Sequence, residues 1–171
     1  IVDNKLDDRG GYDTTAVRQN GDIQLFRLEQ ALFGKIKDGE WKTRLYFYAS
    51  ERGYPGAIVK EEQGRFKHED RQKGRNIFLQ TSIRKRITDS YSTRLSGKYA
   101  YDYLYYESDT LIQKLRNTYM LHDFYISSAN LFGILPFWTA NISADFQWNK
   151  MNSDIKEFIY PQRWSGWIAA A

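Results

Sequence analysis

One segment of the chain, residues 137–149, alternates between apolar and polar residues, and this pattern constrains the fold more than any other feature. The apolar residues occupy every second position: Trp138, Ala140, Ile142, Ala144, Phe146 and Trp148. The positions between them are polar: Asn141, Ser143, Asp145, Gln147 and Asn149. Because successive side chains of a β-strand point to opposite faces, this pattern predicts a strand with one apolar and one polar face.

The same alternation recurs along most of the chain and predicts an all-β fold. It is clear over residues 41–50 and 91–103, and weaker over 22–36, 75–87 and 117–131; a seventh strand is expected to begin near Arg163. The three prolines, Pro55, Pro136 and Pro161, all fall between these segments, where a missing backbone donor is tolerated. We therefore expect one domain over residues 1–171, an antiparallel up-and-down meander of six to seven long strands.

The predicted connections alternate between short and long. Short turns are expected at Asp38-Gly39, at Thr88-Asp89-Ser90 and at 132–136, and long loops at 52–72, 105–116 and 150–163.

These turns predict two strand pairings. The first turn places Trp41 opposite Ile36, and the second places Ile83 opposite Leu95. The third hairpin stays open, because His122 and Asp123 lie on opposite faces and the pattern does not select the buried one.

The spacing of aromatic residues distinguishes a membrane barrel from a soluble sandwich. Trp138 and Trp148 lie ten residues apart on the same face. At about 3.3 Å per residue and a tilt of roughly 40°, about 25 Å separates them along a barrel axis, the height of the apolar band of an outer-membrane barrel. Tyr91 and Tyr101 repeat this spacing.

The predicted strands are also longer than the usual ~5–6 residues of globular sheets. Their second face carries charged residues that suit a wet lumen: Lys42, Arg44, Arg84, Arg94, Lys98, Asp102 and Asp145. The pattern favours a transmembrane β-barrel. Because the smallest single-chain barrels have about 8 strands, we expect these residues to be a segment of a larger barrel.

Composition excludes several classes of protein. The chain has no Cys and two His, which argues against disulfide scaffolds, thiolate sites and a histidine-rich metal centre. No apolar run approaches the ~18 residues of a membrane-spanning helix, and no signal peptide is expected at the start. The net charge of +4 is spread over every segment, unlike the clustered charge of a nucleic-acid binder. No nucleophile and base converge, so we do not expect an enzyme.

Three stretches of the sequence resemble a known family. They are Tyr48–Ala57 (YASERGYPGA), the segment EDRQ at 69–72 leading into NIFLQ at 76–80, and KYAYDY at 98–103. The chain resembles the barrels of TonB-dependent outer-membrane receptors between about residues 19 and 163, most closely the cobalamin-transporter-like members of Bacteroidetes-type Gram-negative bacteria.

The resemblance implies a barrel of about 22 strands, filled by an N-terminal plug, that imports a scarce nutrient through the outer membrane with energy from the TonB complex. The implied cargo is cobalamin or a similar corrinoid, with a siderophore or a glycan as alternatives. Neither a plug nor the remaining strands are expected within these residues. The implied partners are the plug of the parent chain, the TonB complex through that plug, a surface lipoprotein and outer-membrane lipid, but no nucleic acid.

Three groups of candidate functional residues follow. Arg52 and Tyr54 are candidate ligand contacts at an outer-mouth loop; in the alternative interpretation, Gly53 and Gly56 take positive φ in a turn that ends the strand. The lumen- or plug-facing candidates, which could equally form a solvated wall, are Arg44, Tyr46, Tyr48, Arg94, Lys98 and Asp102. The lipid-facing aromatic girdle is predicted at Trp41, Tyr91, Tyr101, Trp138 and Trp148.

No metal site or cofactor is predicted. The only candidate calcium ligands are four acidic residues near the start, Asp3, Asp7, Asp8 and Asp13. They lack the spacing of an EF-hand, so a hydrated loop is the preferred interpretation.

Two other functions are consistent with the pattern. A soluble β-rich binding or adhesion module would stay monomeric in buffer without detergent. Part of a small passive outer-membrane barrel would lack any plug in its parent gene.

Overall fold

The computed structural model describes residues 2–4, 14–16, 20–55, 70–109, 114–155 and 162–171, and its fold is all-β. Seven strands form one sheet: β3 (Ile23–Ile36), β4 (Gly39–Tyr54), β5 (Asp70–Thr88), β6 (Tyr91–Asp109), β7 (Lys114–Leu135), β8 (Trp138–Ser153) and β9 (Gln162–Ala170). Two short strands, β1 (Val2–Asn4) and β2 (Thr14–Ala16), pair separately. Each strand of the large sheet is antiparallel to the next in sequence, so the predicted up-and-down meander is confirmed.

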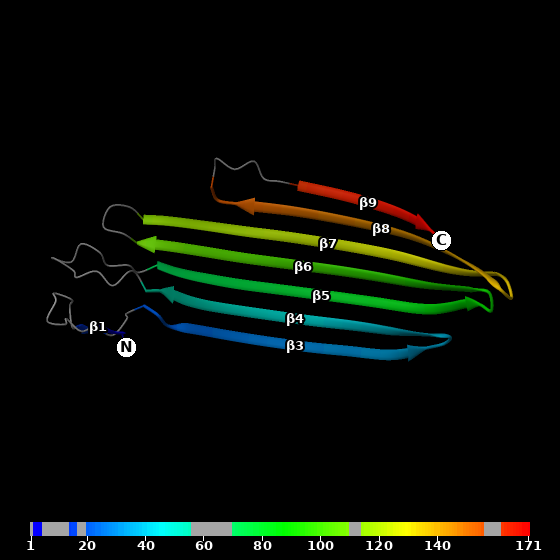
Figure 1. Cartoon of the computed structure of the whole chain (residues 1–171), viewed down its shortest axis with the longest axis horizontal. Coiled ribbons are helices and arrows are strands. Elements are labelled where there is room, and N and C mark those ends of the chain that lie inside the picture. The colour runs from blue at the N-terminus through cyan, green and yellow to red at the C-terminus, as the bar shows by residue number, and fades with distance from the viewer. Residues whose placement is uncertain (1, 5–13, 17–19, 56–69, 110–113, 156–161) are drawn as a thin grey trace.

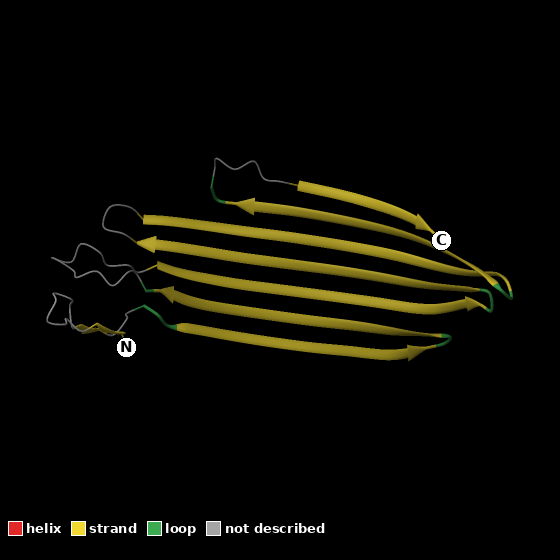
Figure 2. Cartoon of the chain, viewed as in Figure 1, coloured by secondary structure: helices red, strands yellow, loops and turns green. Residues whose placement is uncertain are grey.

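The sheet is a single layer (Figures 1 and 2), and no helix or second sheet covers either face within the described residues. No apolar side chain in this part of the chain is buried, so the sheet has no core of its own. Three tight turns gather at one end of the sheet, which we call the turn end; we call the opposite end the loop end.

The first turn differs by one residue from the prediction. It consists of Lys37 and Asp38, with Asp38 at a φ of 59°, while Gly39 is already paired with Ile36 in the strand. Asp tolerates the left-handed conformation because its short side chain can bond locally. Gly39 has a different role, since a Cβ there would lie 2.3 Å from the carbonyl oxygen of Arg84.

The register follows from these turns. In the first hairpin Trp41 lies opposite Gly34 rather than Ile36, so the predicted pairing is wrong by two residues, although every side chain keeps its face. The predicted pairing of Ile83 with Leu95 is confirmed.

The strands extend farther at the loop end than the alternation predicted. β4 ends at Tyr54 and β5 begins at Asp70, β6 reaches Asp109 and β7 begins at Lys114, and β8 ends at Ser153. The ends of the predicted loops at 52–72, 105–116 and 150–163 are therefore strand. The alternation stops there because both faces are polar, but the backbone ladder continues.

Both outer strands leave one edge unpaired within the described sheet. β3 pairs only with β4, and β9 only with β8. The most exposed large apolar side chains of the sheet lie on these two strands, Ile168 at 82% and Phe33 at 79%.

Candidate functional site: the two faces of the sheet

The sheet has one apolar and one polar face, and the apolar face is defined by every second residue of each strand. Its central band contains, among others, Leu28, Leu45, Phe47, Leu79, Leu95, Ile126, Ile142 and Phe146. Seven strands about 4.8 Å apart and about ten residues of about 3.3 Å each outline an apolar face of roughly 30 Å by 30 Å. This exceeds the apolar patches of roughly 300–600 Å² that soluble monomers expose. An apolar face of this size must be shielded from water by lipid or by another protein layer.

Aromatic residues border this band at the loop end. Cross-strand pairing places Trp164, Trp148, Phe124 and Tyr99 in one row across β9, β8, β7 and β6. The imidazole of His122 lies on the same face, 5.0 Å from the Tyr101 ring, and its Nδ1 lies 3.0 Å from the Tyr99 hydroxyl oxygen. Such amphipathic side chains suit a boundary between an apolar and a wet region.

The turn end has a second aromatic border. Tyr91 stacks on Phe132 with ring centroids 4.8 Å apart, and its hydroxyl donates to Asn130 Oδ1 at 2.9 Å. Trp41 covers Gly34, where a Cβ would lie 2.5 Å from the indole nitrogen. The predicted girdle residues Trp41, Tyr91, Tyr101, Trp138 and Trp148 thus all lie on the apolar face.

The two borders of the band differ in shape. At the loop end, Lys150 is the first charged residue on the apolar face of β8, and its row of partners reaches β4 at Phe47. Relative to this row, the first charged residue on that face lies six residues farther toward the loop end on β7 and β6, two on β5 and four on β4, so the loop-end border is irregular.

The turn-end border drifts steadily across the strands. The row through Trp41 passes four residues from Tyr91 on β6 and reaches β8 at Ala144, six residues from Trp138. Since β8 is four strands from β4, a drift of six residues corresponds to a strand tilt of roughly 45° relative to the band.

The polar face carries all six residues predicted to face a lumen: Arg44, Tyr46, Tyr48, Arg94, Lys98 and Asp102. Tyr46 and Tyr48 stack with centroids 6.5 Å apart. Asp102 accepts a hydrogen bond from the side chain of Asn76, which lies between Asp102 and Tyr48 in the ladder. These six residues therefore share one face of the sheet, and that this face lines a lumen stays a prediction.

A polar network in the middle of this face was not predicted. Asp123 accepts hydrogen bonds from Lys98 Nζ at 2.7 Å, Asn149 Nδ2 at 2.9 Å and Gln147 Nε2 at 3.2 Å. The side chain of Asp123 is 14% exposed and His122 is also half-buried, so neither of the two residues left open by the sequence is fully buried. Nearby, Tyr125 donates to Asp145 at 2.6 Å.

Arg52 and Tyr54, the predicted ligand contacts, lie in β4 rather than in a loop. Arg52 Nη2 donates to Gln72 Oε1 at 3.3 Å, Tyr54 donates to the same oxygen, and the guanidinium lies 5.1 Å from the centre of the Tyr54 ring. Tyr106 packs edge-on against Tyr54 and donates to Asp70 at 3.0 Å. The two residues form part of an aromatic and polar rim at the loop end.

Residues 20–22 clasp the adjoining ends of β4 and β5. The side-chain nitrogen of Asn20, Nδ2, donates hydrogen bonds to the backbone carbonyl oxygens of Tyr54 at 3.3 Å and Asp70 at 2.9 Å. Gly53 is buried beneath this clasp, and a Cβ on it would lie 2.2 Å from Asn20 Oδ1. The expectation of a positive φ at Gly53 is wrong, because this residue is in the strand and its role is to permit close approach.

An ion-pair network holds the clasp. Arg71 donates to Asp22 at 2.7 Å and to Glu51 at 3.1 Å. The hydrogen bond from Arg71 lowers the pKa of Asp22 below its ordinary value.

The other predictions concern residues without described side chains. Asp7, Asp8, Asp13 and Gly56 lie outside the described residues, and for Asp3 only the strand position is described. Among the described residues, no cluster of His, Cys, Asp or Glu could hold a metal ion.

No protein-family model matches the chain, and no curated protein matches it significantly. In the part of the chain that the structure describes, no helix is long and apolar enough to cross a membrane.

Proposed function

We propose that this chain is a segment of the transmembrane β-barrel of a TonB-dependent outer-membrane receptor that imports a scarce nutrient, with cobalamin or a similar corrinoid as the favoured cargo. The apolar face contacts lipid, and the polar face lines the lumen and holds the plug of the parent protein.

The oblique apolar band is the observation that carries the proposal. Strands of outer-membrane barrels tilt by about 35–45° and cross an apolar band about 25 Å tall with aromatic girdles at both borders. The drift of the turn-end border between β4 and β8, roughly 45°, is consistent with this tilt. The polar opposite face and the single layer agree with a wall between lipid and water.

The unpaired edges support a larger barrel. In hydrocarbon every unsatisfied backbone group costs several kcal/mol, so a membrane sheet must close on itself. The seven strands of the sheet are fewer than the ~8 of the smallest barrels. Further strands must therefore pair with β3 and β9.

The polar face suggests how transport proceeds. Residues at the rim, including Arg52 and Tyr54, face the outer mouth and contact arriving cargo. The network around Asp123 and Lys98 is a rigid, water-facing wall against which the plug rests. A pull through TonB then shifts the plug and opens a path, and this chain breaks no covalent bond.

Uptake measurements on the bacterium that carries the parent gene test this function. We expect deletion of that gene to abolish high-affinity uptake of labelled cyanocobalamin, and removal of the TonB complex to have the same effect. Uptake that depends on the gene but not on TonB would indicate the passive barrel instead. Loss of siderophore or glycan uptake alone would support the proposed receptor function but contradict cobalamin as its cargo.

A further inference from the structure

Two arginines face each other on the polar face near the turn end. Arg84 of β5 and Arg94 of β6 are direct cross-strand partners, and both are exposed. Side chains at such positions have Cβ atoms about 4.5–5.5 Å apart, and like charges there destabilise a sheet. An anionic group between the two arginines would remove this destabilisation.

Neither arginine finds that group within the described residues. Ion pairs occupy other basic residues, as with Lys98 and Asp123 at 2.7 Å or Arg86 and Asp38 at 3.7 Å, but none involves Arg84 or Arg94. Glu40 is the partner of Arg84 on β4, yet it forms no ion pair with it and also lies opposite Lys35.

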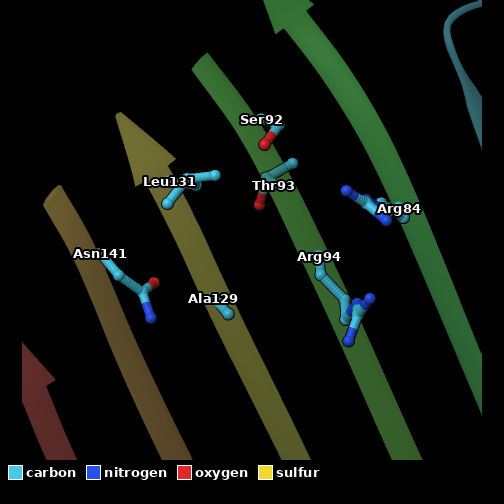
Figure 3. A pocket seen from close by; sticks show the side chains of 7 residues that line it. All are labelled: Arg84, Ser92, Thr93, Arg94, Ala129, Leu131 and Asn141. Carbon is cyan, nitrogen blue, oxygen red and sulfur yellow. The ribbon is translucent and has the colours of Figure 1, made fainter. Parts of the chain in front are cut away.

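The two arginines line a depression of about 190 Å³, shown in Figure 3. Ala129 and Leu131 supply apolar lining, and Ser92 and Asn141 supply polar groups. Figure 3 shows both arginine side chains extending over the strip between β5 and β6. The volume is below the roughly 300–1,000 Å³ of pockets for small-molecule ligands, and suits a single side chain better.

This lining selects one class of occupant. A single guanidinium binds a carboxylate through two parallel hydrogen bonds, so either arginine can hold one while the other adds charge, and the exposed Leu131 favours an occupant with an apolar stem. An Asp or Glu side chain of a polypeptide has both parts, whereas free phosphate has only the charge. We propose that the depression between Arg84 and Arg94 receives an acidic side chain of the polypeptide that fills the barrel, an inference that rests on the proposed function.

The neighbouring groups on this face do not compete for that role. An adjacent depression of about 370 Å³ shares Arg84 and Ser92 with this one, and there the carboxylates of Asp38 and Glu40 offset most of the charge of Lys35, Arg84 and Arg86. In the Asp123 network, Lys98 is already paired with the carboxylate of Asp123, which also accepts hydrogen bonds from Gln147 and Asn149.

Peptide binding to the full chain in lipid vesicles tests the inference. The probe is a fluorescently labelled, capped tri-glutamate peptide, with tri-glutamine as the neutral control, followed by fluorescence anisotropy. We expect Arg84→Gln with Arg94→Gln to weaken tri-glutamate binding at least about tenfold, because each charged hydrogen bond lost is worth more than a neutral one. The control variant, Arg27→Gln with Arg163→Gln, removes the same charge from the same face and should change binding less than about twofold.

The outcomes separate the two proposals. Equal weakening in both variants would mean general attraction to a basic face and would overturn the inference. Competition by inorganic phosphate at concentrations that match tri-glutamate would assign the site to small anions and would also overturn it. Tryptophan quenching by lipid, measured on the parent barrel that supplies the strands beyond β3 and β9, reports insertion separately: inserted protein without a selective effect rejects only the pocket, whereas failure of the parent barrel to insert rejects the barrel.

Discussion

Gly53 shows how one residue fixes the end of a hairpin. The clasp formed by Asn20 and Asp22 lies directly over it, and the Gly53 amide donates to the Asp22 carbonyl oxygen at 3.0 Å. Any Cβ at this position would meet backbone and side-chain atoms of Asn20, so the clasp would have to move.

We therefore predict that Gly53→Ala lowers the free energy of unfolding by roughly 1–3 kcal/mol, the usual cost of overpacking. The measurement is urea unfolding of the chain in detergent micelles, followed by tryptophan fluorescence. Gly97→Ala is the matched control in β6, because its Cβ would meet nothing closer than 3.9 Å. That variant should be unchanged or up to about 1 kcal/mol more stable. Equal losses in both variants would contradict the clasp.

At the residue scale, the sequence predicts faces better than contacts. Alternation correctly places Lys98 and Asp102 on one face of their strand, and Trp138 and Trp148 on one face of theirs, because residues an even number of positions apart share a face. It does not reveal that Asp123 accepts three hydrogen bonds, since this requires the register of β7 against both neighbours.

Trp164 was missed for a related reason. Its place beside Trp148 depends on the pairing of β9 with β8, which no turn motif specifies.

At the scale of elements, the length of a strand and the length of its apolar pattern are separate quantities. β7 has 22 residues, although its alternation predicts only 117–131. Beyond the band, hydrogen bonds between backbones maintain the pairing while tyrosines and charged residues occupy both faces. Hydrophobic periodicity therefore finds the band and underestimates the strand.

The register of the first hairpin is a second property of elements, and engineered disulfides test it. The chain has no Cys, so no native thiol competes. Gln30 lies opposite Leu45, whereas the pairing expected from an Asp38-Gly39 turn places Leu32 there.

We predict that Gln30→Cys with Leu45→Cys forms a disulfide efficiently, because directly opposed residues fall within the Cα separation that a disulfide spans. Leu32→Cys with Leu45→Cys should oxidise poorly, since diagonal neighbours are about 7–8 Å apart. Non-reducing gel electrophoresis after mild oxidation measures the fraction of each variant that forms the intramolecular disulfide. Preferential bridging of the second pair would establish the other register.

At the scale of the whole molecule, the sheet is a wall without a core. A sandwich would bury one face against a second layer, but the described residues include neither a second layer nor a buried apolar side chain. Within the apolar band the two faces differ in chemistry, and the band crosses the strands at a tilt like that of a membrane barrel. These strands do not identify the cargo, because most of the rim residues that they contribute form hydrogen bonds with one another.

Two tryptophans on opposite faces provide the most direct test of lipid contact. Trp148 lies on the apolar face within the aromatic border, whereas Trp167 lies on the polar face opposite Asp145 and is 52% exposed. Variants that retain only one of these tryptophans, with Phe at the other four positions, isolate each face. The measurement is tryptophan fluorescence in vesicles of lipids with brominated acyl chains, relative to unbrominated lipids. The barrel account predicts strong quenching of Trp148 and little quenching of Trp167; equal quenching of both, or none of Trp148, would contradict it.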